Sequence, residues 1–90
     1  MDKKVSIYIV EDYLLARITC RKALEQFKDL EIKNDFETAE ECIEALEKNP
    51  VDVILMDIGL PYMTGVEATK IINEKYPNTK IIMLTSHDNQ

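Results

Sequence analysis

The sequence contains few of the residues that bind soft metal ions or form covalent cross-links. Its 90 residues include two cysteines, Cys20 and Cys42, and one histidine, His87. The two cysteines lack the spacing of a zinc site and are too few for a disulfide framework. We therefore expect two small buried thiol side chains in a reducing compartment, and a solvated loop position for His87.

Positive charge and long apolar runs are also scarce. The chain has 11 Lys and Arg against 17 Asp and Glu, a formal net charge of -6. Because binding to a nucleic-acid backbone rests on cationic side chains, this segment is not expected to hold DNA by itself. The apolar run Val5–Val10 is short and ends in acids, which excludes a signal peptide, and no apolar run in the sequence is long enough to span a membrane. We expect a cytoplasmic protein that does not bind membranes.

The sequence does contain a regular alternation of apolar and amphipathic segments. Hydrophobic residues make up 46% and charged residues 31%, a composition typical of one small globular domain. Short apolar runs predict four strands, at Val5–Val10, Glu31–Phe36, Val51–Met56 and Lys80–Leu84. Helical periodicity predicts three helices between them, from Tyr13 to Phe27, from Thr38 to Asn49, and from Gly65 to just before Pro77.

Each predicted helix carries an apolar stripe that we expect to be buried. The stripe of the first helix comprises Ala16, Cys20, Ala23, Leu24 and Phe27. The stripes of the second and third helices comprise Ala39, Cys42, Ile43 and Leu46, and Ala68, Ile71 and Ile72, respectively. The second helix also opens with a capping-box pattern, in which the Thr38 hydroxyl and the Glu41 carboxylate satisfy free backbone amides.

The order βαβαβαβ determines the expected fold class. Strands that are apolar almost throughout, joined by helices, predict an α/β protein with a parallel sheet, right-handed crossovers and helices on both faces. In such sheets, ligands bind outside the carboxyl ends of the strands, where the strand order reverses.

Acidic and hydroxyl side chains follow three of the predicted strands. The first strand ends at Glu11 and Asp12, the third at Asp57, and the fourth at Thr85 and Ser86. If the first and third strands are neighbours, three carboxylates meet in one crevice. Two carboxylates about 4 Å apart repel by roughly 4 kcal/mol at an effective dielectric near 20, so either a proton or a divalent cation must compensate them.

The ligand types favour Mg²⁺, with Mn²⁺ as a substitute, because the site offers oxygen atoms and neither histidine nor cysteine. A metal beside a carboxylate suggests that Asp57 is a nucleophile in phosphoryl transfer and forms an aspartyl phosphate. A hydroxyl such as that of Thr85 then hydrogen-bonds the phosphoryl group. A solvated acidic surface without such chemistry remains the alternative.

Several short motifs, taken in order, resemble a known family. They are "VED" at Val10–Asp12, "LMD" at Leu55–Asp57, "DIGLPYMTG" with Pro61 and Gly65, and "LTS" at Leu84–Ser86. The chain resembles the receiver domain of bacterial two-component response regulators. Its sequence is most similar to those regulators that carry a LuxR-type helix-turn-helix output domain. The resemblance implies a flavodoxin-like three-layer α/β/α fold.

The resemblance also implies a role for each matching residue. Asp57 would be the phosphoacceptor, and Glu11, Asp12, Asp57 and the Gly59 backbone carbonyl would hold Mg²⁺. Thr85 would be the switch hydroxyl, while Pro61 and Gly65 would shape the loop and start the third helix. The partner would be a sensor histidine kinase, and the chain would be a phosphoacceptor rather than an enzyme.

The predicted elements cover only part of the family pattern, which has five strands and five helices. We expect residues 1–90 to form the N-terminal part of a receiver, without the last helix, strand and helix and without the family's phosphate-binding Lys. The fourth strand then becomes an edge, and Leu14, Leu15 and Ile18 form an apolar patch on the first helix. We expect self-association or domain swapping through these surfaces.

Two rival functions remain open. The chain could be a structural or self-assembling module, natural or engineered, that has lost phosphotransfer. It could also be a phosphohydrolase with an aspartyl nucleophile, but such enzymes usually carry a second acid two residues after the nucleophile, where this chain has Gly59.

Overall fold

The seven elements follow one another in the order that the sequence predicted. A computed structural model describes residues 3–84 of the chain, so Thr85, Ser86 and His87 lie outside the described residues. The elements are β1 (Val5–Val10), α1 (Leu14–Glu25), β2 (Leu30–Phe36), α2 (Ala39–Lys48), β3 (Val53–Asp57), α3 (Gly65–Lys75) and β4 (Lys80–Leu84).

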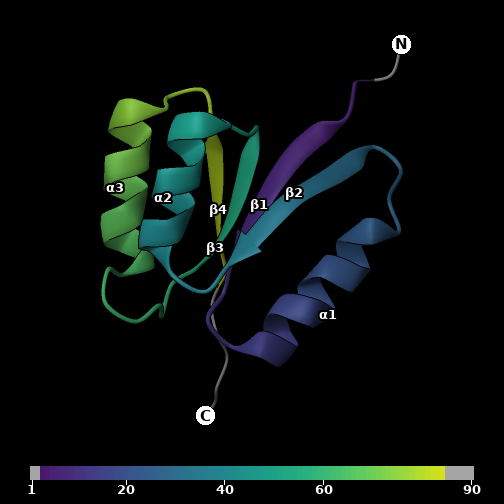
Figure 1. Ribbon diagram of the computed structural model, residues 1–90, viewed down its shortest axis with the longest axis horizontal. Coiled ribbons are helices and arrows are strands. Elements are labelled where there is room, and N and C mark those ends of the chain that lie inside the picture. The colour runs from purple at the N-terminus through teal and green to yellow at the C-terminus, as the bar shows by residue number, and fades with distance from the viewer. Residues whose placement is uncertain (1–2, 85–90) are drawn as a thin grey trace.

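The four strands form one parallel sheet in the order β2-β1-β3-β4. α1 lies on one face of the sheet, and α2 and α3 lie on the other, which gives three layers (Figure 1). The predicted flavodoxin-like α/β class is confirmed. Because β1 and β3 are central neighbours, the strand order reverses between them, and ligand sites in such sheets lie at that point.

The main core fills the space between the sheet and the helices α2 and α3. Alternate residues of β1 and β3 point into it, and the burial of Ala39, Cys42 and Leu46 on α2 and of Ala68 and Ile72 on α3 matches the predicted stripes. Ile43 and Ile71 are only partly buried, because they stand at the margins of their stripes. The sheet residues in this core are Tyr8, Val10, Ile54 and Met56.

The first helix departs from its prediction. None of the α1 residues is buried, and Ala23 and Phe27, which the periodicity placed on the buried stripe, are exposed. The helix also ends at Glu25, before Phe27. The physical reason is that α1 is the one helix on its face among residues 3–84, so it packs against β1 and β2 with no second helix beside it. Cys20 is therefore half-buried, whereas Cys42 is fully buried as predicted.

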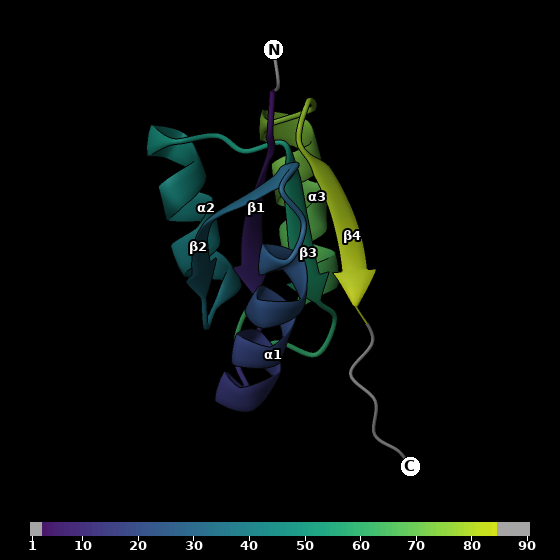
Figure 2. The same ribbon diagram turned by 90° about the vertical axis from the view of Figure 1, so that its right-hand side faces the viewer.

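The two edges of the sheet differ in regularity. At the β2 edge the register with β1 shifts between Ile7 and Tyr8, so that Lys33 is an extra, unpaired residue in a bulge. β4 lies beside β3 at the other edge of the sheet (Figure 2). Its pairing with β3 runs without interruption from Lys80 to Leu84. Bulges and charged side chains are common means of blocking an edge, so β4 is the less protected of the two.

None of the three described helices combines the length and the apolar character that crossing a membrane requires.

Candidate functional site

Three carboxylates meet at the carboxyl ends of β1 and β3. Glu11 and Asp12 directly follow β1, Asp57 is the last residue of β3, and one side-chain oxygen from each lies within 4.8 Å of the others. The two strands are paired with Val10 opposite Met56, which brings the residues that follow to the same edge of the sheet. The convergence that the sequence predicted is therefore present in the fold.

The three carboxylates differ in their access to water. Asp57 is buried, with 3% of its surface exposed, whereas Glu11 is half-buried and Asp12 is exposed. The Asp57 Oδ1 atom accepts a hydrogen bond of 3.3 Å from the Gly59 amide. One such bond offsets only part of the cost of burying a carboxylate, so Asp57 lies at the base of a site that favours a further cationic partner.

The environment of the cluster shifts the pKa of Glu11. Burial raises the pKa of its carboxyl, and the nearby charges of Asp57 and Asp12 raise it further. The Tyr13 amide at the start of α1 donates a hydrogen bond of 3.1 Å to Glu11 Oε2, which opposes the rise in pKa. Three carboxylates that offer hard oxygen donors within 4.8 Å of one another, with the charged form of Glu11 disfavoured, fit Mg²⁺ or Mn²⁺.

Gly65 allows the start of α3 to pack against the end of β3. A Cβ atom at Gly65 would lie 2.5 Å from the Asp57 carbonyl oxygen and 3.1 Å from Ile58 Cα. A residue with a side chain at this position would force the backbone of α3 or of β3 to shift. Within the same loop Pro61 is half-buried, and Tyr62 adopts a left-handed backbone with φ of 62° and is 84% exposed.

The N-terminal capping box of α3 was not predicted from the sequence. The Thr64 hydroxyl accepts a hydrogen bond of 3.1 Å from the Glu67 amide, and the Glu67 carboxylate accepts one of 3.0 Å from the Thr64 amide. The segment Thr64–Glu67 has the spacing T-x-x-E that would have found it. At the start of α2, where the capping-box pattern was predicted, one of the two predicted bonds forms: the Glu41 amide donates a hydrogen bond of 3.2 Å to the Thr38 hydroxyl.

Arg17 is a second residue near the site that sequence reasoning missed. The helical pattern placed it away from the apolar stripe, yet its Nη1 atom donates a hydrogen bond of 2.7 Å to the Glu11 carbonyl oxygen. A contact between the backbone of one element and a side chain of the next leaves no periodic signal in a sequence.

Leu84 ends the described chain beside the site. The Ile58 amide, one residue after Asp57, donates a hydrogen bond of 3.0 Å to the Leu84 carbonyl. Thr85 is outside the described residues, so its role as switch hydroxyl stays a prediction.

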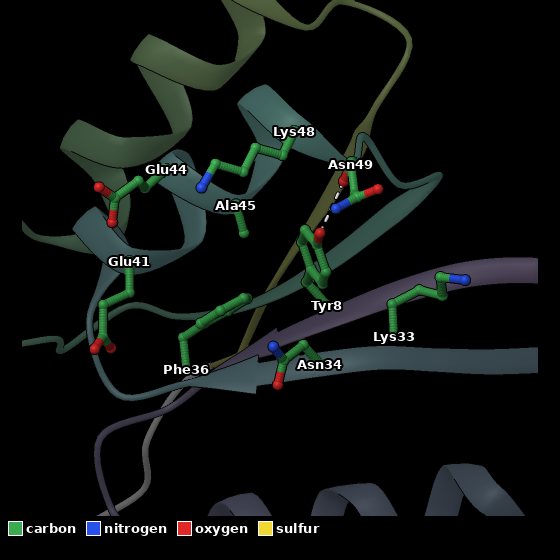
Figure 3. A pocket seen from close by; sticks show the side chains of 9 residues that line it. All are labelled: Tyr8, Lys33, Asn34, Phe36, Glu41, Glu44, Ala45, Lys48 and Asn49. Carbon is green, nitrogen blue, oxygen red and sulfur yellow. Dashed lines mark hydrogen bonds between the residues drawn. The ribbon is translucent and has the colours of Figure 1, made fainter.

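A separate hollow of about 610 Å³ lies between α2 and β2 (Figure 3). Tyr8 and Phe36 meet edge to face at its base with ring centroids 5.1 Å apart, and the Tyr8 hydroxyl donates a hydrogen bond of 2.7 Å to the Asn49 carbonyl. Its charged lining residues, Lys33, Glu41, Glu44 and Lys48, are of mixed sign, and none of the three clustered carboxylates lines it. The hollow is thus distinct from the carboxylate site.

Comparisons with known proteins agree with this arrangement. Residues 7–90 match the response regulator receiver domain, and the chain belongs to this family. It is 37% identical over 89 residues to the transcriptional regulatory protein DegU of Brevibacillus brevis, covering 99% of this chain and 38% of DegU. It is 35% identical over 83 residues to the response regulator UvrY of Escherichia coli K12, covering 92% of this chain and 38% of UvrY.

Solved structures show the same fold. The isolated receiver domain of RcsB from Salmonella enterica serovar Typhimurium, solved with the phosphomimetic BeF₃⁻, superposes with a TM-score of 0.87 at 28% identity, covering 97% of this chain and 65% of that one. RcsB bound to promoter rprA superposes with a TM-score of 0.88, also at 28% identity, covering 97% of this chain and 50% of RcsB. The chain spans about two fifths of the length of the curated relatives DegU and UvrY.

Proposed function

We propose that this chain is the phosphoacceptor of a two-component signalling system and that Asp57 receives the phosphoryl group of a phosphohistidine on a sensor histidine kinase. The observation that carries the proposal is the meeting of Glu11, Asp12 and the buried Asp57 at the reversal point of the sheet. Membership of the receiver family supports it independently.

The proposed reaction assigns a task to each residue of the site. A carboxylate oxygen of Asp57 forms a bond to phosphorus while the bond from phosphorus to the imidazole nitrogen breaks, and the electron pair of that bond stays on the nitrogen. Glu11, Asp12, Asp57 and the Gly59 carbonyl would hold Mg²⁺, which when bound neutralises the charge of the carboxylates and of the transferred oxygens. The Thr85 hydroxyl would bind the product phosphoryl group. The chain would thus be a substrate of phosphotransfer rather than a turnover enzyme.

The proposed output is control of transcription in a longer protein. DegU is named as a transcriptional regulatory protein, and the RcsB structures include complexes with DNA. Because residues 7–90 match the receiver domain and the net charge of the 90-residue chain is -6, we assign DNA binding to a separate output domain and place the signalling reaction in the cytoplasm.

Mass spectrometry of the intact chain tests the phosphoacceptor directly. Incubation with Mg²⁺ and acetyl phosphate should add one phosphoryl group, and the Asp57→Asn variant should add none. Asp29→Asn is the matched control, since it makes the same change at an exposed position just before β2. Continuous release of phosphate without an adduct would point to a hydrolase. Absence of both adduct and turnover on the folded chain would contradict the proposal.

A second candidate function is self-assembly, in which a copy of this chain pairs along the β4 edge. It is favoured by the uninterrupted register of β4, by Ile82 at 51% exposure, and by the exposed apolar side chains of Leu14, Leu15 and Ile18 on α1. Within residues 3–84 no strand pairs with the outer edge of β4, and the free backbone groups of a regular apolar strand are a template for another strand.

The oligomeric state tests this second candidate. Light scattering should show a dimer for the native chain and a monomer for Ile82→Lys. Asn34→Lys adds the same charge to the bulged β2 edge and should leave the dimer intact. A native chain that stays monomeric at high concentration would rule out this assembly.

A further inference from the structure

Arg17 joins two elements at the edge of the carboxylate site. Its side chain is 12% exposed, although it lies on a helix with no buried residue. Its Nη1 atom donates a hydrogen bond of 2.7 Å to the Glu11 carbonyl oxygen, and its Nε atom lies 3.1 Å from Asp35 Oδ1 near the end of β2. The planar guanidinium can hold acceptors in two directions at once, which a single ammonium group does less well.

These contacts belong to a closed ring. The Glu11 amide donates a hydrogen bond of 3.0 Å to the carbonyl of Phe36, which is the chain neighbour of Asp35. Glu11 is therefore held at its amide by β2 and at its carbonyl by Arg17, while Arg17 itself is held by β2 through Asp35. The ring fixes the backbone of Glu11 from both sides.

The carbonyl that Arg17 binds has a particular position in the chain. It belongs to the peptide bond between Glu11 and Asp12, the two acids of the site that follow β1. A change of ψ at Glu11 or of φ at Asp12 turns this peptide unit and reorients the two side chains relative to each other and to Asp57. A contact that fixes the peptide unit thus fixes two of the three carboxylates together.

Hydrophobic packing contributes little to holding α1 on the sheet. None of its residues is fully buried, and Ala16, Cys20 and Leu24 of its apolar stripe are only half-buried, so apolar contacts hold the helix on the sheet less firmly than they hold α2 and α3. The ion pairs from α1 to Asp35 supply the missing anchor.

We propose that Arg17 is a positioning residue for the metal site and that it holds the Glu11–Asp12 peptide so that both carboxylates face Asp57. This inference rests on the proposed function, because it presumes that the three carboxylates bind Mg²⁺. Partners that orient the ligands of a metal commonly change its affinity by about 10- to 100-fold when they are removed.

Arg21 provides a matched control on the same helix. Its Nη2 atom lies 2.7 Å from Asp35 Oδ2, its Nε atom donates a hydrogen bond of 2.8 Å to the same oxygen, and its Nη1 atom pairs with Glu25 at 3.6 Å. Arg21 thus anchors α1 to the same carboxylate, but within residues 3–84 its polar contacts are to Asp35 and Glu25 and not to Glu11. Loss of either arginine should weaken the docking of α1, whereas only loss of Arg17 releases the Glu11 carbonyl.

The experiment measures the Mg²⁺ dissociation constant of the full chain by an NMR titration that follows the Gly59 amide, with urea unfolding run in parallel. Arg17→Ala should raise the dissociation constant about tenfold, and Arg21→Ala should change it less than about twofold. Equal weakening in both variants, or no weakening in Arg17→Ala, would show that Arg17 acts only through the stability of α1 and would overturn the inference.

A milder variant covers the case in which Arg17→Ala does not fold. Arg17→Lys keeps the charge beside Asp35 but replaces the two-directional fork with one nitrogen, so we expect a folded chain with a dissociation constant raised about threefold or more. Arg17→Lys with native Mg²⁺ affinity would overturn the inference. A native chain that binds no Mg²⁺ would instead overturn the proposed function, and the inference with it.

Discussion

A Cβ atom on Gly65 would lie 2.5 Å from the carbonyl oxygen of Asp57. The first residue of α3 therefore packs directly on the backbone of the proposed phosphoacceptor. The loop between them cannot relax without moving one of the two elements, because Leu60 within it is also buried. The position of Asp57 at the base of the site depends on this close approach.

Substitution of Gly65 tests this dependence. Gly65→Ala should lower the free energy of unfolding by about 1–3 kcal/mol, since the methyl group meets backbone atoms that have no alternative rotamer. It should also slow phosphorylation by acetyl phosphate, because α3 and Asp57 are pushed apart. The control is Val66→Ala at the next, exposed position, which should change stability by no more than about 0.5 kcal/mol. Equal stability of the two variants in urea would contradict the close packing.

The caps of α2 and α3 allow a comparison of one interaction in two places. Thr38→Ala and Thr64→Ala each remove an N-cap hydroxyl that accepts a backbone hydrogen bond, and each should cost about 1 kcal/mol of unfolding free energy. Thr64 lies in the loop that follows Asp57, whereas Thr38 lies at the start of α2. We therefore expect only Thr64→Ala to slow phosphorylation, by severalfold. Equal phosphorylation rates in the two variants would show that the cap of α3 does not support the site.

The sequence predicted the carboxylate cluster on the condition that the first and third strands are neighbours, because the carboxyl ends of parallel strands lie at one edge of the sheet. The strand order β2-β1-β3-β4 meets that condition and brings Glu11, Asp12 and Asp57 together. The sequence also correctly predicted the burial of the apolar stripes of α2 and α3, because both helices and the sheet face that they cover belong to the described chain.

The predicted burial of the α1 stripe was wrong. An apolar stripe in a sequence indicates which side chains can be buried, but not whether other elements cover them, and among residues 3–84 no second helix lies beside α1. Arg17 escaped detection because its partners lie far apart in the sequence, Glu11 in the loop after β1 and Asp35 in β2, and the Glu11 partner is a backbone atom.

Cys42 offers a chemical probe of the main core. Burial raises the pKa of the Cys42 thiol to about 12, so at pH 8 only about one thiol in ten thousand is ionised in the native state. Alkylation by iodoacetamide in a Cys20→Ala background should therefore be very slow and should accelerate on addition of urea. Alkylation of native Cys42 at the rate of the unfolded chain would show that packing of α2 on the sheet does not protect this thiol from the reagent.

Asp52 and Ser6 join the starts of β1 and β3 at the end of the sheet remote from the site. The Asp52 carboxylate accepts hydrogen bonds of 2.9 Å from the Ser6 amide and 3.1 Å from the Ser6 hydroxyl. These bonds favour the ionised form and lower the pKa of Asp52 below its usual range. A carboxyl with a lowered pKa in the folded state stabilises the fold above the pKa of the unfolded chain, and this contribution disappears as the pH falls through the folded pKa.

Asp52→Asn should consequently lower the free energy of unfolding at pH 7 by about 0.5–1 kcal/mol, a modest value because the pair is exposed. The difference from the native chain should begin to shrink below about pH 4, the ordinary pKa of an unfolded aspartate, and should be lost as the pH falls through the lower pKa of the native carboxyl. Urea unfolding at a series of pH values measures both effects, and Asp29→Asn, an exposed carboxyl changed in the same way, corrects for the loss of one negative charge. A stability difference that stays constant down to about pH 2, well below the ordinary pKa of an aspartate, would mean that the Asp52 charge contributes nothing and that the introduced carboxamide destabilises the fold for steric reasons alone.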